Sequence, residues 1–444
     1  MEMASARSRP AARARQMSDQ IVLWAACVLL SALSLLLLLV SVSSGFGAAR
    51  LTGEINVLVR TTTTTTTTSD AVDDVVVAVE QCGVDDGDDG DHMLVDGEWV
   101  RDDERRPLYE PQRCPFVDEG FRCRENGRPD GAFAKWRWQP RHCTLPRFDA
   151  KNLLEKLRNR RLVFVGDSIG RNQWESMLCM LATAVSGDGD KAASIYEEHG
   201  SPITKHKGAL SFRFRDNNCT VEHYRSPYLV RRGRPPRRAP KRAEVRSTLQ
   251  LDAMDARAHH WKDADVVVFN TGHWWSHERL QQLHCYFQVG KKLRLDMSIE
   301  AAYQRAMSTL TSWVHLEVNP HKSLVIFRTY SPAHTRASNS GSCAKETTPE
   351  LNSSRISIHR WPGMVNPAFE PSRSGTSAAK LHLLNVTLMA AQRRDGHPSV
   401  YNVAAASRLP AAARQRADCS HWCLPGVPDA WNELLYAIIL KRFS

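Results

Sequence analysis

The stretch Arg161-Leu162-Val163-Phe164-Val165-Gly166-Asp167-Ser168 decides the fold of this chain. Its apolar run is short and continuous, which is typical of a strand buried on both faces of a parallel sheet. The residues that follow, 171–182, have apolar side chains at helical spacing. The sequence here therefore predicts a buried strand, then a loop that carries Gly166, Asp167 and Ser168, then a helix.

Two later segments repeat this pattern. Residues 265–269 form an apolar run that leads into Asn270-Thr271-Gly272-His273-Trp274-Trp275, and residues 323–327 form another. A stretch of helical spacing, 299–317, lies between them. Buried strands that alternate with helices predict an α/β fold of three layers with a parallel central sheet. Functional loops gather at the carboxyl ends of such strands, where both Ser168 and Asn270 are expected.

The N-terminal part predicts a membrane anchor. Residues 21–42 carry no charge, and such a run can cross a bilayer core of roughly 30 Å at about 1.5 Å per residue. Arginines precede it at positions 7, 9, 13 and 15, whereas the next charge after it is Arg50. The positive-inside rule therefore favours a cytosolic tail, 1–20, and a lumenal body. A cleaved signal peptide is the alternative, since small residues follow at 43–49, but its apolar region would exceed the usual length.

Composition divides the rest of the 444 residues, of which 42% are hydrophobic, into a stem and one large body. Residues 43–92 predict a disordered stem, because a threonine tract at 61–68 and many acidic residues cannot bury enough apolar surface to fold. Residues 93–150 are rich in Cys, Trp and Pro and predict an irregular subdomain stapled by disulfides. Residues 151–444 hold the predicted strands and form the expected catalytic α/β domain.

Cysteine usage indicates an oxidising compartment. Only Cys27 lies in the apolar N-terminal segment, and the other ten cysteines suggest disulfides, whose pairing the sequence leaves open. A zinc site at Cys419, His421 and Cys423 is the alternative, but the spacing fits no zinc signature and a lumenal thiol tends to be oxidised. We therefore expect no metal. The glycosylation candidates are Asn218, Asn352 and Asn385.

A strongly basic segment, 231–242, lies between the first two predicted strands of a chain with net charge +11. In a cytosolic protein such a segment would suggest nucleic acid, but lumenal placement argues against that partner. Two hypotheses stay open. The segment is a solvated loop, or it attracts an acidic polysaccharide such as a glucuronate-bearing chain.

The C-terminal sequence Asp418-Cys419-Ser420-His421-Trp422-Cys423 places an acid and a base three residues apart, so that both can lie on one side of a turn. A serine hydroxyl is a poor nucleophile until a base takes its proton and a third group fixes the tautomer of that base. We expect Ser168 to be the nucleophile, His421 the base and Asp418 the orienting acid. These three residues would form a catalytic triad for acyl transfer. The alternatives are an N-cap role for Ser168 and a surface pair for Asp418 and His421, and Asp167 is expected to be a turn residue.

Further candidates surround this nucleophile. Gly166 permits close backbone approach, and the N–H of Ser168 at a helix N-terminus can face a developing oxyanion. The amide of Asn270 and the backbone N–H of Gly272 are additional candidates for oxyanion donors. Arg171, one turn beyond Ser168, can reach the same oxygen or the acceptor, and the alternative for it, Asn270 and Gly272 is an ordinary structural role such as bonding to a buried carbonyl. The other substrate candidates are His273, Trp274 and Trp275. Core packing is the default role of these tryptophans, and offering their faces to sugar rings is the functional alternative.

These motifs resemble the signature blocks of the plant trichome birefringence-like proteins. One block is Val165-Gly166-Asp167-Ser168 with Arg171-Asn172-Gln173, and the other is 418–429 with Trp431-Asn432. Further blocks of that family are similar to Gly127-Arg128-Pro129-Asp130, Trp136-Arg137-Trp138-Gln139-Pro140 and Asn270-Thr271-Gly272-His273-Trp274-Trp275. The resemblance covers roughly residues 93–444.

The resemblance implies an SGNH-like fold, related to the GDSL/SGNH esterases, in a Golgi-resident, single-pass type II membrane protein. It also implies transfer of an acetyl group to a plant cell-wall polysaccharide, for which we favour xylan, through a triad of Ser168, His421 and Asp418. The co-substrate is then an acetyl donor, acetyl-CoA or a relayed acetyl group, with no bound cofactor. Other Golgi proteins of polysaccharide synthesis are expected partners.

Three alternatives stay open: an acetylesterase with water as the acceptor, an acetyltransferase acting on xyloglucan, mannan or pectin, and a non-catalytic polysaccharide-binding protein. The sequence departs from the family at one place, because His92 lies near the position of a usual cysteine before Gly97-Glu98-Trp99. The nearest cysteine is Cys82, so a disulfide from this region requires Cys82 as the substitute.

Overall fold

The computed structural model describes residue 82 and residues 94–185, 194–203, 208–236, 245–335, 343, 346–358, 362–365, 380–403 and 417–443. The predicted cytosolic tail, membrane anchor and stem lie outside these residues, apart from Cys82. Within this part of the chain, no helix is both long and apolar enough to cross a membrane.

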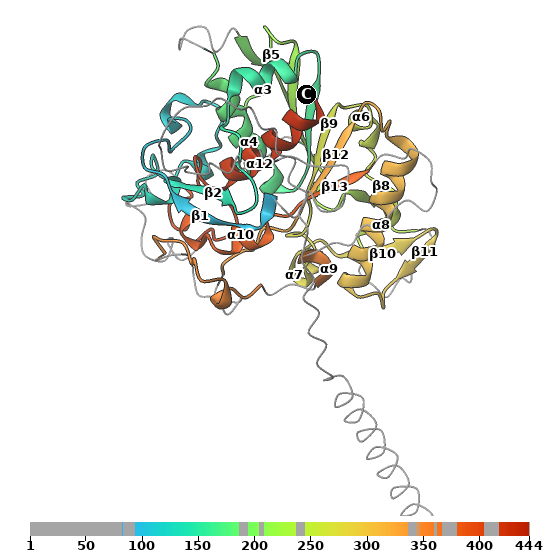
Figure 1. Ribbon diagram of the computed structural model, residues 1–444. Helices are drawn as coiled ribbons and strands as arrows, with labels where there is room; N and C mark the ends of the chain where they lie inside the picture. Colours follow the sequence, from blue (N-terminus) through green and yellow to red (C-terminus); the bar gives the residue numbers. More distant parts are fainter. Residues whose placement is uncertain are drawn as a thin grey trace, which may run out of the picture. The chain divides into compact units, whose positions relative to one another are not determined.

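A seven-stranded sheet forms the centre of the fold, in the order β13-β12-β9-β3-β6-β5-β4 (Figure 1). The strands from β13 to β6 are parallel, and β5 and β4 pair antiparallel at one edge. Their bounds are β3 (Arg161–Gly166), β4 (Ile195–Glu197), β5 (Ala209–Phe214), β6 (Cys219–Arg225), β9 (Val266–Phe269), β12 (Leu324–Arg328) and β13 (Leu381–Leu384). The three strands expected from the sequence are β3, β9 and β12, so the prediction of a parallel α/β sheet is confirmed.

Alternate side chains of the central strands enter two different hydrophobic cores, as strands covered on both faces require. Leu162 and Phe164 of β3 belong to one core, and Val163 and Val165 belong to the other. The first core includes α3 (Ala150–Lys156), α4 (Ser168–Ala182) and α12 (Val427–Arg442), and the second includes α8 (Ile299–Glu317). The helix predicted at 299–317 is α8, and the three-layer arrangement is present.

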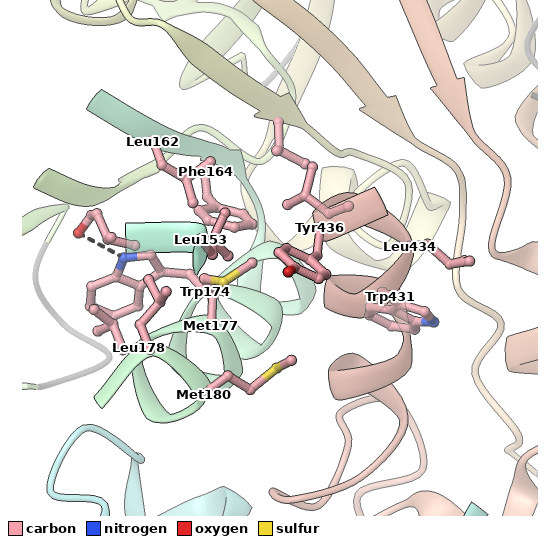
Figure 2. Close-up of a cluster of buried hydrophobic side chains, with 14 of the residues drawn as sticks. Leu153, Leu162, Phe164, Trp174, Met177, Leu178, Met180, Trp431, Leu434 and Tyr436 are labelled. Atoms are coloured by element: carbon pink, nitrogen blue, oxygen red, sulfur yellow. Dashed lines mark hydrogen bonds between the residues drawn. The ribbon is translucent and has the colours of Figure 1, made fainter. Parts of the chain in front are cut away.

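The first core fixes the helix that begins at Ser168. Figure 2 shows side chains of β3, α4 and α12 gathered in it, among them Phe164, Trp174 and Trp431. Each large apolar side chain is stabilised by about 1.5–3 kcal/mol when it is fully buried rather than exposed. Because α12 is buried from Val427 to Ile439, it packs as a central element and holds α4 against the sheet.

A second sheet, which the sequence analysis did not anticipate, lies beside the second core in the order β11-β10-β8-β7. Its strands are β7 (Val230–Gly233), β8 (Ser247–Met254), β10 (Cys285–Val289) and β11 (Lys292–Arg294). The expectation of a loop throughout 231–242 is wrong for residues 231–233, which belong to β7 and pair with β8. Residues 237–242 lie outside the described part. The other helices are α6 (Ala258–Trp261), α7 (His277–Gln282), α9 (Pro362–Val365) and α10 (Thr387–Ala391).

The Cys- and Trp-rich segment before β3 packs onto the same core as α4. Its strands β1 (Gly97–Arg101) and β2 (Trp136–Pro140) pair antiparallel, and Trp99 packs edge-to-face on Trp138 with ring centroids 5.6 Å apart. The indole of Trp99 donates to the carbonyl of Met389 at 2.9 Å. The 3-10 helices among the described residues are η1 (Pro111–Arg113), η2 (Glu119–Phe121), η3 (Ala132–Ala134), η6 (Ser353–Arg355) and η7 (Arg394–Gly396).

Disulfides connect this segment to the rest of the protein. The pairs are Cys82–Cys143, Cys114–Cys179, Cys123–Cys423 and Cys343–Cys419. The expectation of disulfides is therefore confirmed, including Cys82 as the substitute cysteine. Cys219 and Cys285 are buried and outside these pairs, so the even count did not mean that every cysteine is paired.

The Cys123–Cys423 disulfide is expected to contribute strongly to stability. It joins residues 300 positions apart, and closing a long loop restricts the unfolded chain. We expect the double variant Cys123→Ala/Cys423→Ala to lose about 2–5 kcal/mol of unfolding free energy in denaturant titrations. Cys285→Ala, which removes a buried sulfur but no disulfide, is the control and should lose about 1 kcal/mol. Equal losses in the two proteins would contradict this prediction.

Candidate active site

Three side chains from opposite ends of the sequence form one hydrogen-bonded chain. The Ser168 hydroxyl donates to Nε2 of His421 at 2.7 Å, and Nδ1–H of His421 donates to Oδ2 of Asp418 at 2.7 Å. The other oxygen of Asp418 accepts from the backbone N–H groups of Ser420 (3.0 Å) and His421 (3.1 Å). The side chains of His421 and Asp418 are 25% and 23% exposed, so the chain opens to solvent at one side.

Asp167 prepares the position of Ser168. Its carboxylate caps α4 by accepting the N–H of Ile169 at 2.9 Å. The N-cap is thus Asp167, and the alternative role of Ser168 as an N-cap is wrong. Ser168 is the first residue of α4, so its hydroxyl is free to contact His421 and its N–H lies at the positive end of the helix dipole.

Asn270 lies against the turn that carries Ser168. Its amide donates to Oδ1 of Asp167 at 2.6 Å, and the residue is only 4% exposed. A Cβ atom on Gly166 or Gly170 would lie 2.0 or 1.9 Å from the amide oxygen of Asn270, so both positions need glycine. The close approach expected at Gly166 is therefore an approach of Asn270, and the loops after β3 and β9 meet as expected for neighbouring parallel strands.

The segment that carries Asp418 and His421 is fixed on both sides. Trp422 exchanges two hydrogen bonds with the side chain of Asn172 in α4, at 2.7 and 3.1 Å. The disulfides of Cys419 and Cys423 flank His421. Both cysteines are therefore unavailable as thiolate ligands, which rejects the alternative of a zinc site with His421.

The electrostatics of the pair favour charge on both partners. Burial opposes protonation of His421, but the charge and hydrogen bond of Asp418 outweigh it and raise the pKa of His421 above its ordinary value. Burial also opposes ionisation of Asp418, yet His421 and the two backbone N–H groups hold the pKa of Asp418 well below its usual range. An imidazolium that forms at His421 is thus stabilised by a carboxylate that stays ionised.

Comparisons with known proteins identify the family of this chain. Residues 145–438 match the model of the PC-Esterase family, the "GDSL/SGNH-like Acyl-Esterase family found in Pmr5 and Cas1p", and residues 93–144 match the PMR5 N-terminal domain. Protein trichome birefringence-like 9 of Arabidopsis thaliana is 43% identical over 78% of this chain and 83% of its own length. Probable xylan O-acetyltransferase 11 of Oryza sativa subsp. japonica is 37% identical over 77% of this chain and 85% of its own length.

The chain belongs to the trichome birefringence-like family. It is an acyltransferase with an SGNH-like fold.

The other predicted residues of this trichome birefringence-like protein divide between the site and the interior. Arg171 is turned inward, where it bonds to Glu175 at 2.8 Å and to Asp118 at 3.4 Å, so its structural alternative applies. Trp275 is completely buried in the second core, so it has the default role of core packing and cannot offer a face to a sugar. Trp274 is half-buried at the same edge of the sheet as Asn270.

The remaining loop candidates lie close to Tyr330, which follows β12. A Cβ atom on Gly272 would lie 2.6 Å from the Tyr330 ring, so this position requires a residue without a side chain. His273 contacts the carbonyl of Ser331 through Nε2 at 2.7 Å, and its ring packs on Tyr330. The three strands predicted from the sequence thus bring their following loops together.

Two of the three glycosylation candidates of this protein are exposed. Asn218 is exposed in the turn between β5 and β6, and Asn352 is exposed at the start of η6. Asn385 is half-buried after β13, where its side-chain oxygen accepts from Thr329.

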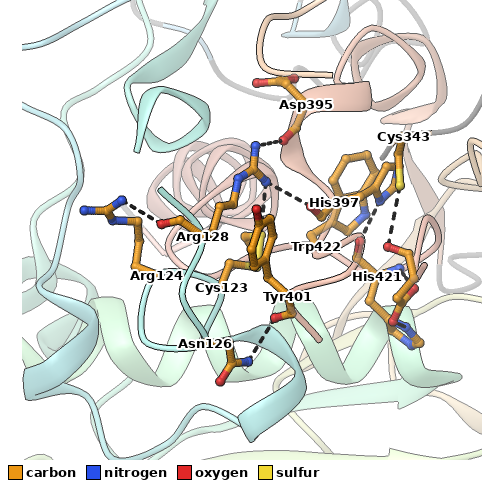
Figure 3. Close-up of a disulfide and its surroundings, with 12 residues drawn as sticks. Cys123, Arg124, Asn126, Arg128, Cys343, Asp395, His397, Tyr401, His421 and Trp422 are labelled. Carbon is orange, nitrogen blue, oxygen red and sulfur yellow. Dashed lines mark hydrogen bonds and ion pairs between the residues drawn. A yellow bond between two sulfur atoms is a disulfide. The ribbon is translucent and has the colours of Figure 1, made fainter. Parts of the chain in front are cut away.

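Sequence analysis missed a pair of buried histidines, His397 and His334, behind the segment that carries His421; Figure 3 shows His397 beside Trp422. His397 stacks on Trp422 with ring centroids 4.0 Å apart, and its Nδ1–H donates to the carbonyl of His421 at 2.6 Å. Its Nε2 lies 2.7 Å from Nδ1 of His334, whose Nε2–H donates to the carbonyl of Ala391 at 3.0 Å. No motif signals this pair, because its members are 63 residues apart and meet only in the fold.

Counting donors shows what a hydrogen bond between the two histidines requires. Each ring already uses one N–H for a carbonyl, so two neutral rings would bring two lone pairs together at 2.7 Å. The contact is a hydrogen bond only when one ring is doubly protonated. Burial acts in the opposite direction, since it lowers the pKa of His334 to about 4 and the pKa of His397 well below its ordinary value.

His397 is expected to position His421 through its backbone. His397→Ala removes the donor to the His421 carbonyl and the ring under Trp422, so we expect kcat/KM to fall about 10- to 100-fold, as small misplacements of catalytic groups do. The matched control is His321→Ala, because His321 is exposed in the loop before β12 and should be replaceable without effect. The measurement is the initial acyl-transfer rate of both variants. An unchanged rate in His397→Ala would contradict this prediction and show that the other contacts of the segment hold His421 in place.

Proposed function

We propose that this protein transfers acetyl groups to hydroxyls of a plant cell-wall polysaccharide, with xylan as the acceptor. The observation that carries the proposal is the chain of hydrogen bonds from Ser168 through His421 to Asp418 in an acyltransferase of this family. Xylan is favoured because a relative that is 37% identical is named a probable xylan O-acetyltransferase.

The proposed reaction is a double displacement. Ser168 Oγ attacks the carbonyl carbon of the acetyl donor while His421 Nε2 takes the hydroxyl proton. The tetrahedral intermediate expels the donor group, which receives that proton from His421, and leaves an acetyl ester on Ser168. A sugar hydroxyl then attacks the ester, again with His421 as the general base, and the proton returns to Ser168 Oγ as the acetylated sugar leaves.

Two groups are placed to stabilise the negative oxygen of each intermediate. The backbone N–H of Ser168 lies at the N-terminus of α4, and the amide of Asn270 has a second N–H besides the one bonded to Asp167. Such preorganised donors contribute about 10²- to 10³-fold each in acyl-transfer enzymes. Asn270 and Ser168 are therefore the oxyanion donors of the proposal.

A hollow of ≈ 1160 Å³ is lined by residues that include Asp118, Glu119 and Gly120. The next residue, Phe121, packs on the ring of His421 with centroids 5.4 Å apart. Ser168, His421 and Asp418 are not among the lining residues, so we assign the hollow to a part of the sugar chain away from the reacting unit.

The donor and the cellular setting are further parts of the proposal. The donor is acetyl-CoA or a relayed acetyl group, used as a co-substrate and not as a bound cofactor. Residues 21–42 anchor the protein in the Golgi membrane as a single-pass type II protein with the catalytic domain in the lumen. Other Golgi proteins of polysaccharide synthesis are the proposed partners.

The test is acetyl transfer to defined acceptors. The full chain, produced in a secretory host that forms its disulfides, is incubated with an acetyl donor and unacetylated oligosaccharides of xylan, xyloglucan, mannan or pectin, and product mass is followed. Acetylated xylo-oligosaccharide supports the proposal. Acetate without acetylated sugar would instead indicate an esterase, and acetylation of another polymer would change the acceptor. No turnover with any donor would favour a binding protein.

A further inference from the structure

A tryptophan between two arginines lies at the carboxyl ends of the strands of the central sheet. The guanidinium of Arg225, at the end of β6, is 5.1 Å from the centre of the Trp274 ring, and that of Arg279, in α7, is 5.3 Å from it. Both arginines are exposed, and Trp274 is half-buried between them. Stacking on an aromatic ring fixes a guanidinium while leaving its N–H groups free to bind a ligand.

This cluster of Arg225, Trp274 and Arg279 lies at the carboxyl ends of the central strands, where Ser168 also lies. Arg225 is the residue of β6 that pairs with Gly166 of β3, two residues before the nucleophile. Ser226 donates its N–H to the carbonyl of Gly166 at 2.7 Å. Trp274 lies in the loop that begins with Asn270, whose amide bonds to Asp167. A ligand held by the cluster is therefore held beside the reacting serine.

The positive charge of the cluster is not neutralised by the protein. Within the part of the chain that the structure describes, neither Arg225 nor Arg279 forms an ion pair, whereas nearby Arg257 pairs with Asp255 at 3.0 Å. Arg232 of β7 adds a third exposed cation, and its Nε donates to the hydroxyl of Ser247 at 3.3 Å.

Tyr228 shows that the three cations gather in one place. Its ring packs edge-on against Trp274 with centroids 6.1 Å apart. Burial raises the pKa of its hydroxyl, and the charges of Arg225, Arg232 and Arg279 each act to lower it. Three like charges around one residue repel one another and raise the local concentration of anions. An anionic ligand would relieve that repulsion.

We propose that Arg225, Trp274 and Arg279, with Arg232, form a subsite for the carboxylate of a uronic acid residue on the polysaccharide acceptor. The inference rests on the proposed function for the class of ligand. Guanidinium groups match carboxylates through paired N–H···O bonds, and the aromatic ring orients them. The subsite refines the sequence-based hypothesis about residues 231–242, because Arg232 is the member of that segment found in the cluster.

Binding measured without acetyl transfer tests the subsite. The full-length Ser168→Ala protein is titrated calorimetrically with a neutral xylo-oligosaccharide, with the same backbone carrying one glucuronate, and with an oligogalacturonate. We expect at least one acidic ligand to bind about 10-fold more tightly than the neutral one at low salt, with the advantage shrinking as salt screens the charges. The stronger acidic ligand distinguishes a substituted xylan from a pectin as the source of the uronate.

Substitutions that remove the charges of Arg225 and Arg279 test whether these residues cause the preference for acidic ligands. Arg225→Gln/Arg279→Gln, added to that protein, should abolish the preference for acidic ligands and leave neutral binding within about twofold, and Arg279→Glu should weaken acidic binding further. Arg213→Gln is the matched control, because Arg213 is a surface arginine paired with Glu198. Absence of any preference for acidic ligands, or a preference that survives the double substitution, overturns the proposal. Failure of acetyl transfer with intact binding would count against the proposed reaction and leave the subsite in place.

Discussion

Ser168→Ala is expected to reduce kcat/KM for acetyl transfer by about 10⁴- to 10⁶-fold, the range found when the nucleophile of a hydroxyl–imidazole pair is removed. The substitution deletes a single oxygen, the one that lies 2.7 Å from Nε2 of His421. The residue before it, Asp167, still caps α4, and the packing of α4 on the sheet does not involve the hydroxyl. The loss should therefore appear in the rate and not in stability or acceptor binding.

The control for this substitution is Ser420→Ala. Ser420 lies between Asp418 and His421, and its backbone N–H, which alanine retains, bonds to the carboxylate. Its activity should stay within about twofold of the parent protein. If Ser168→Ala kept more than one hundredth of the parent rate while unfolding at the same denaturant concentration, the acetyl-serine intermediate would be refuted, and a direct attack of the sugar on the donor would take its place.

The features that local sequence could reveal are the ones that depend on local physics. Residues 162–165, 266–269 and 324–327 are apolar because both faces of those strands are covered, and the pattern alone identified β3, β9 and β12. The helix at 299–317 was equally visible. Asp418 and His421 were predicted to interact because they are only three residues apart in the sequence. In the structure their side chains form a 2.7 Å hydrogen bond.

The features that sequence reasoning missed depend on contacts between distant segments. The sequence left the role of Arg171 open between the site and the interior, because the partners that bind its guanidinium, Glu175 and Asp118, include one that is 53 residues away. Trp275 fills the second core because β10 and α8 supply Phe287 and Tyr303 around it, and neither neighbour is visible from the loop sequence. The second sheet escaped notice because β7 begins in an arginine-rich stretch that reads as a loop.

The Cys- and Trp-rich segment takes part in the site instead of only bracing the body. Phe121 packs on the ring of His421, Asp118 bonds to Arg171, and Cys123 is joined to Cys423 two residues beyond His421. Without this segment, one side of the imidazole and one end of the catalytic loop would lose their support. It follows that the match of residues 93–144 to a domain of its own describes sequence similarity, while the apolar side chains of this segment share one core with α4 and α12.

Asp418→Asn is expected to lower kcat/KM by about 10³- to 10⁴-fold, although only one atom changes. The backbone N–H groups of Ser420 and His421 bind Oδ1 of Asp418, and an amide oxygen is the only atom of asparagine that can accept them. The NH₂ group would then face Nδ1 of His421 and force its proton onto Nε2. That tautomer points an N–H at Ser168 and cannot accept the hydroxyl proton. Asp216→Asn, in the exposed turn after β5, is the matched control.

The pH dependence distinguishes this tautomer effect from a general loss of structure. His421 must be neutral to act as a base, and Asp418 raises its pKa above the ordinary value of about 6.5. The rate of the parent protein should therefore rise with pH through a midpoint above 6.5. Without the carboxylate, imidazolium loses its counter-charge and the midpoint should move to lower pH, so the variant is relatively less impaired in acid than at neutral pH. A midpoint that stays in place in Asp418→Asn would mean that another group controls the acid limb, because no other change in this variant touches the charge beside His421.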